Sequence, residues 1–64
     1  MEQVLEAFKR QFEALEPFLD ERTKRLYVGS MAKELGHGGI VQIAKMTKMS
    51  EETVSKGVKE LGDP

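Results

Sequence analysis

The stretch "IAKMTKMSEETV", residues 43–54, decides the fold. Its small or apolar residues Ala44, Met49 and Val54 follow one another at steps of five. On one continuous helix, residues five apart point about 140° away from each other, so the three would share no face. Two short helices that meet across a tight turn bring all three together. The spacing therefore predicts a helix-turn-helix, with Ala44 at the helix crossing, Met49 in the turn and Val54 docking the second helix.

A helix start inside this stretch supports the turn. Ser50 has a side-chain oxygen that can accept hydrogen bonds from the backbone N–H groups of a first helical turn. Glu51 and Glu52 follow it, at positions where the helix dipole favours negative charge. Lys48 stands at the turn position that is commonly glycine, so we expect it to take a left-handed backbone conformation.

The rest of the chain predicts two more helices ahead of this pair and no sheet. Apolar residues recur at steps of three and four, and no segment alternates with the period of two that a strand requires. Pro17 ends the first helix, Asp20 is the N-cap of the second, and Gly36 is its C-terminal stop. The predicted helices cover residues 2–16, 20–35, 40–47 and 51–61. The fold class is therefore all-α, a small four-helix domain with a C-terminal helix-turn-helix.

The expected core consists of the apolar residues that face inward on these helices. They are Leu5, Phe8, Phe12 and Leu15 on the first helix, Leu26, Tyr27, Met31 and Leu35 on the second, Ile40, Ile43 and Ala44 on the third, and Val54, Val58 and Leu61 on the fourth. Met46 and Met49 fill the core or its corner with flexible thioether side chains. Gly57 costs a helix interior roughly 0.5–1 kcal/mol relative to alanine, so we expect another helix to approach closely there.

The composition limits the classes of protein to which this chain can belong. The 64 residues make one small domain, and they contain no apolar run near the roughly 20 residues that span a bilayer. We therefore expect no membrane association. There is no cysteine, and His37, expected in an exposed loop, cannot make a zinc site alone, so no metal or cofactor is expected. The N-terminus is acidic and amphipathic, unlike a signal peptide, which makes the cytoplasm the expected location.

Charge is distributed unevenly along the chain. The net charge of −1 does not by itself indicate a nucleic-acid binder. Residues 1–22 carry six acids and three bases, residues 23–50 carry five bases and one acid, and residues 51–64 carry four acids and two bases. The middle of the chain is therefore a basic segment between acidic flanks. Its first part, "ERTKR" at 21–25, is either an edge that contacts phosphates or a solvated helix face.

Four short segments carry a resemblance to a known family. They read "LDERTKR" (19–25), "LGHGG" (35–39), "AKMTKMSEETV" (44–54) and "GVKEL" (57–61). Together they resemble the N-terminal region of bacterial insertion-element transposases of the Rhodopirellula type. Lys48 stands at that family's glycine, and Glu51 and Glu52 stand where such proteins often carry a basic or neutral residue.

The resemblance implies a module that binds double-stranded DNA and recognises the ends of the element. The family's metal-dependent strand transfer belongs to a later acidic-triad domain that these residues do not include. We therefore expect residues 1–64 to be a single domain, the N-terminal module of a longer transposase. Asp63 and Pro64 would then begin a linker.

The expected DNA-contacting residues lie in the turn and on the fourth helix, whose N-terminal half would face base edges in the major groove. They are Lys48, Ser50, Glu52, Thr53, Ser55, Lys56 and Lys59. Lysines can reach phosphates or guanines, the hydroxyls of Thr53 and Ser55 can donate to phosphate or base, and Glu52 can accept from cytosine N4. The alternative is a solvated face on which Glu52 and Lys56 pair one helical turn apart.

Other functions remain open from the sequence. A small helix-turn-helix transcriptional regulator would share the same features. A helical protein-interaction module, in which the acidic first helix mediates a homodimer, fits the near-neutral charge. An enzyme is not expected, because the chain shows no nucleophile–base pairing and no clustered ligands, and is too short to enclose a pocket.

Overall fold

The computed structural model describes residues 2–62, which form four α-helices and one short 3-10 turn, with no strand among them. The helices are α1 (Glu2–Leu15), α2 (Glu21–Leu35), α3 (Gly39–Thr47) and α4 (Glu51–Gly62), and the 3-10 turn η1 (Glu16–Phe18) follows α1 directly. The predicted all-α class is confirmed, and every predicted helix boundary lies within one residue of the observed one. The predicted linker start at Asp63 and Pro64 lies outside the described residues.

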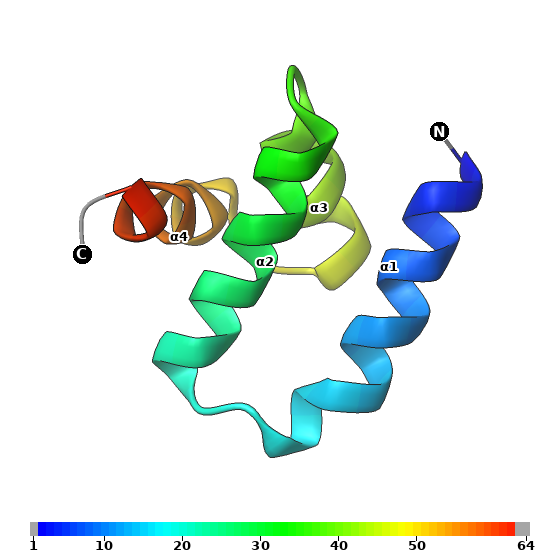
Figure 1. Ribbon diagram of the computed structural model, residues 1–64, viewed down its shortest axis with the longest axis horizontal. Coiled ribbons are helices and arrows are strands. Elements are labelled where there is room, and N and C mark those ends of the chain that lie inside the picture. Colours follow the sequence, from blue (N-terminus) through cyan, green and yellow to red (C-terminus); the bar gives the residue numbers. More distant parts are fainter. Residues whose placement is uncertain (1, 63–64) are drawn as a thin grey trace.

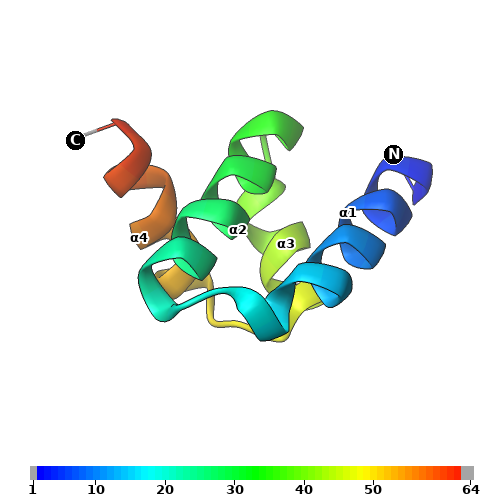
Figure 2. The same ribbon diagram turned by 60° about the horizontal axis from the view of Figure 1, so that its bottom comes forward.

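The helices are arranged around α2. In Figure 1, α1 and α2 form the two arms of a V that η1 joins at its base. In both Figure 1 and Figure 2, α3 lies between these arms, and α4 packs on the side of α2 that faces away from α1. The chief contacts of α2 are with α4 and α3, whereas α1 packs mainly against α3. No helix in residues 2–62 is long and apolar enough to cross a bilayer.

The ends of α2 form as the sequence predicts. The Asp20 carboxylate accepts a hydrogen bond from the Thr23 backbone N–H at 2.7 Å, which makes Asp20 the N-cap. At the other end Gly36 has a φ of 77° and donates its N–H to the carbonyls of Ala32 and Lys33 at 3.2 Å. A positive φ is accessible to glycine without the steric cost that a Cβ brings, so the chain can leave α2 here and turn into α3.

A core of seven residues joins all four helices. It consists of Phe12, Val28, Met31, Ala32, Ile43, Ala44 and Val54. Most of the predicted inward residues either belong to this core or pack against it, but Val28 and Ala32 were not expected. Val28 is fully buried, and it lies one helical turn before Ala32, whose carbonyl group lies against Gly39 at the start of α3.

Three expected core residues lie outside the core, which corrects the prediction. Leu15 is 45% exposed and Leu61 is 38% exposed, and Leu26 is only half-buried. Leu15 is the last residue of α1, where the chain passes into η1. Leu61 lies in the last turn of α4, beyond the point where that helix crosses α2.

The crossing of α2 and α4 is made by two glycines. A Cβ atom placed on Gly29 would lie 2.5 Å from the carbonyl carbon of Gly57 and 2.6 Å from the backbone nitrogen of Val58. A Cβ placed on Gly57 would collide with the carbonyl oxygen of Arg25. The close approach expected at Gly57 is therefore confirmed, and Gly29 is its partner. This backbone-to-backbone contact fixes where α4 sits on the rest of the domain.

Candidate nucleic-acid interface

The turn between α3 and α4 has the geometry that residues 43–54 predict. Lys48 takes the left-handed conformation, with φ 61° and ψ 25°, and it is the one non-glycine residue with a positive φ in the described part of the chain. The Ser50 side-chain oxygen accepts from the Thr53 backbone N–H at 3.1 Å, so the predicted cap is confirmed. Ala44 and Val54 are buried and Met49 packs against the core between them. The α3 and α4 helices thus form a helix-turn-helix.

Four of the seven predicted site residues share one surface. Glu52, Ser55, Lys56 and Lys59 border a single shallow hollow on the outer side of α4, which we call the α4 strip. Glu52, Lys56 and Lys59 are exposed and Ser55 is half-buried, while the opposite side of the helix is buried against α2 and α3. The strip therefore presents one carboxylate, one hydroxyl and two ammonium groups in a row along the exposed side of a helix.

The other three predicted residues are placed differently. The Thr53 hydroxyl lies 2.8 Å from the Ser50 side-chain oxygen, so both side chains serve the start of α4. Lys48 is exposed, but it borders a hollow between α1 and the end of α3, together with Lys9 and Lys45. The structure thus does not bring Lys48 and Ser50 into the α4 strip.

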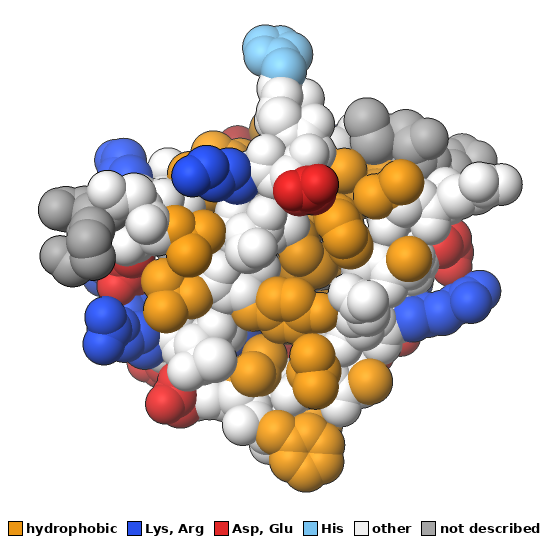
Figure 3. All heavy atoms as spheres, in the orientation of Figure 1, with side chains coloured by type: hydrophobic (Ala, Val, Ile, Leu, Met, Phe, Trp, Pro, Cys, Tyr) orange, Lys and Arg blue, Asp and Glu red, His pale blue; other side chains and the backbone are white. Residues whose placement is uncertain are grey.

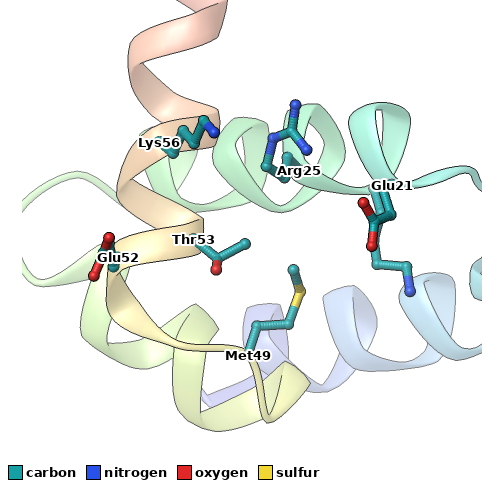
Figure 4. A pocket seen from close by; sticks show the side chains of 7 residues that line it. Glu21, Arg25, Met49, Glu52, Thr53 and Lys56 are labelled. Carbon is teal, nitrogen blue, oxygen red and sulfur yellow. The ribbon is translucent and has the colours of Figure 1, made fainter.

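A groove runs beside the strip, between the N-terminal halves of α2 and α4. Figure 4 shows Arg25 and Glu21 on α2 facing the α4 residues, with Met49 from the turn between the two helices. The groove has a volume of about 360 Å³ and is lined by Glu21, Lys24, Arg25, Met49, Glu52, Thr53 and Lys56. It offers both signs of charge, so a ligand would meet carboxylates as well as cations rather than a uniformly basic surface.

Arg25 in this groove is held by a residue from the far end of α4. Its Nε donates to Glu60 Oε1 at 2.7 Å and its second guanidinium nitrogen to Oε2 at 3.2 Å. The hydrogen bond with Glu60 raises the pKa of Arg25 above its ordinary value. The same hydrogen bond lowers the pKa of Glu60, and the nearby charges of Lys56 and Arg22 act in the same direction. The guanidinium therefore keeps its positive charge, and a carboxylate of the same domain balances that charge.

The basic segment at residues 23–50 presents less free charge than its sequence suggests. The described residues contain two ion pairs, Lys24 with Glu16 at 3.5 Å and Arg25 with Glu60. Each pair joins a base of that segment to an acid of a flanking segment. Sequence reasoning missed these pairings because they depend on how α4 and η1 lie against α2. In the "ERTKR" stretch, Lys24 and Arg25 are therefore engaged in ion pairs within the domain.

Comparison with known proteins adds no relative. No family model, curated protein or solved structure matches this chain. The features of this chain that bear on its function are therefore the helix-turn-helix and the side chains of the α4 strip.

Proposed function

We propose that this chain is a DNA-binding domain whose α4 helix enters the major groove of double-stranded DNA. The observation that supports it most is the α4 strip, a polar surface on the exposed side of a capped helix whose other side is fixed to α2. The second helix of a helix-turn-helix reads base edges with its N-terminal residues, while the first crosses the sugar–phosphate backbone. Lys56 and Lys59 then reach guanines or phosphates, and Ser55 donates to either.

The finer proposal comes from the sequence resemblance. The domain would recognise the ends of an insertion element as the N-terminal module of a longer transposase, acting in the cytoplasm. A small transcriptional regulator is the alternative within the same class of function. In either case the domain binds DNA without a cofactor and without catalysing a reaction itself.

A titration with duplex DNA at two salt concentrations tests the proposal. We expect binding of a mixed-sequence duplex with a Kd on the order of 10⁻⁴–10⁻⁶ M, weakening as salt rises, because bound lysines release counterions from the phosphates. The double variant Lys56→Ala, Lys59→Ala should bind more weakly and depend less steeply on salt. The matched control is Lys9→Ala, Arg10→Ala, which removes the same charge from exposed positions on α1.

Two results would count against this function. One is the absence of any salt-dependent binding by the unchanged domain at low ionic strength. The other is an equal loss of affinity in both double variants, since binding would then follow net charge and not the α4 strip.

A second candidate is association with another copy of the chain. Figure 3 shows hydrophobic side chains gathered across the face that α1 and α2 present, down to η1. Phe18 is 83% exposed, and Leu15 and Val4 on α1 are each more than two-fifths exposed. Exposed apolar surface of this kind is typical of contact sites between proteins. A homodimer would also set two α4 helices at a fixed spacing along DNA.

A further inference from the structure

We propose that Glu52 determines the sequence specificity of the α4 strip, and that it selects a cytosine at one position of the DNA site. This inference rests on the proposed DNA binding and adds which base the site requires. The α4 helix, which would enter the polyanionic DNA, begins with two exposed carboxylates, those of Glu51 and Glu52.

Glu52 borders three hollows around the N-terminal half of α4. They are the hollow of the α4 strip, the groove toward α2, and a third formed with the residues that lead into α3. Figure 4 shows its carboxylate on the outer side of α4, away from Arg25. Within residues 2–62, neither of the two ion pairs and none of the side-chain hydrogen bonds involves this carboxylate. The group is therefore available to a ligand that approaches the helix.

The chemistry of the major groove restricts what such a carboxylate can meet. An ionised carboxylate only accepts hydrogen bonds. Guanine and thymine present acceptors in the groove, adenine presents a donor beside its N7 acceptor, and cytosine presents its N4 amino donor alone. Because the phosphates already repel the charge, a base without a suitable donor leaves the carboxylate desolvated and unpaired. Cytosine relieves this penalty most fully, because the donor of adenine lies beside the N7 acceptor, which repels the carboxylate.

Lys56 supplies the complementary half of the readout. It lies one helical turn beyond Glu52 on the same strip, and no ion pair joins the two side chains in the described structure. Its ammonium group can donate to O6 and N7 of a guanine. The strip therefore presents an acceptor followed by a donor, which matches a cytosine and a nearby guanine.

Glu51 provides a matched control for this role. It carries the same charge in the same helical turn, but it borders only the hollow toward the start of α3 and not the α4 strip. One residue along a helix turns the side chain by about 100°. The two glutamates therefore contribute similarly to the helix dipole, but of the two only Glu52 borders the α4 strip.

The test is selection of bound duplexes from a random pool by the unchanged domain and by Glu52→Gln, Glu52→Ala and Glu51→Gln. The unchanged domain should enrich cytosine at one position, with replacement of that base weakening binding about tenfold. Glu52→Gln should shift the preference at that position to adenine, because an amide can both donate and accept against N7 and N6. Glu52→Ala should lose the preference there and bind mixed-sequence duplex more tightly. Glu51→Gln should keep the cytosine.

The outcomes separate this inference from the proposed function. If the unchanged domain binds no duplex, DNA binding itself fails. If it binds and selects sites without a required cytosine, or if the Glu52 and Glu51 variants select the same sites, DNA binding stands and the role of Glu52 is overturned. Melting curves of the two glutamine variants should agree, so a difference in their selected sites reports contact with DNA and not loss of folding.

Discussion

Lys48 adopts a backbone conformation that is unfavourable for a residue with a side chain. A left-handed backbone costs a non-glycine residue roughly 1–2 kcal/mol, and Lys48 adopts it with φ 61°. Lys48→Gly should therefore raise the free energy of unfolding by a few tenths to about 1 kcal/mol, since part of the gain is lost to the freer unfolded chain. For a domain of this size that corresponds to an increase of several degrees in melting temperature, measurable by circular dichroism.

Lys45→Gly serves as the control for this substitution. Lys45 is exposed and lies within α3, so glycine there should lower stability by up to about 1 kcal/mol. Melting temperatures that fall for both variants would show that Lys48 is not under backbone strain.

Gly57 is a residue at which the structure leaves no room for a side chain. Its Cβ would collide with the carbonyl oxygen of Arg25, and backbone on both sides leaves nothing flexible to move aside. Gly57→Ala should destabilise the domain by about 3 kcal/mol or more, in spite of alanine's better helix propensity. Gly62→Ala, in the same helix but facing open space, should be neutral or slightly stabilising. Equal midpoint concentrations for the two alanine variants in urea titrations would contradict the crossing.

These two residues show what the sequence could and could not reveal at this scale. The left-handed Lys48 follows from its place between a predicted helix end and a predicted cap. Gly57 stands out because glycine is unfavourable inside a helix. Gly29 is equally essential, but its role depends on where α4 crosses α2, which no local pattern specifies.

At the scale of elements, the Arg25–Glu60 pair ties the start of α2 to the end of α4. The bond to Arg25 lowers the pKa of Glu60, and hydrogen bonds from Thr23 lower the pKa of Asp20. At pH values between the lowered pKa values and the ordinary ones, the folded state therefore binds fewer protons than the unfolded state. The stabilisation is complete above the ordinary carboxylate range and is lost as pH falls from about 4.5 through the lowered values.

Urea titrations at pH 7 and at pH 3.5 test this linkage. The domain should unfold at a lower urea concentration at pH 3.5, and Glu60→Gln should reduce the difference between the two midpoints. Glu34→Gln replaces an exposed glutamate outside both ion pairs and should leave that difference unchanged. If Glu60→Gln behaves as Glu34→Gln does, the pair does not contribute to the acid response.

The elements themselves were predictable, whereas their mutual packing was not. Capping residues and apolar spacing predict all four helices to within one residue. The α4 strip was also predictable, because residues at steps of three and four share a helix face. The groove lined by Glu21 and Arg25 could not be predicted, since it exists only through the crossing of α2 and α4. The exposure of Leu15 depends likewise on how the end of α1 lies against the rest of the domain, which the apolar spacing does not specify.

At the scale of the whole molecule, the apolar face between α1, η1 and α2 bears on the oligomeric state. Phe18 is almost fully exposed, so Phe18→Ser should leave the melting temperature nearly unchanged. If this face joins two copies, sedimentation over a range of concentrations should show dimers of the unchanged domain and fewer dimers of the variant. Val41→Ser, which replaces a residue 41% exposed on α3, should not alter association. A monomer at every concentration would remove the homodimer.

The contact between Gly29 and Gly57 also has a mechanical consequence. Where side chains separate two helices, a push on one is absorbed in part by rotation of those side chains. Here peptide groups of α2 and α4 meet directly, so the interface is stiff. A load applied to α4 by a bent or twisted duplex would pass straight into α2. The α1 helix contains no glycine and joins the core through the side chain of Phe12, so it can yield to a load more readily than α4.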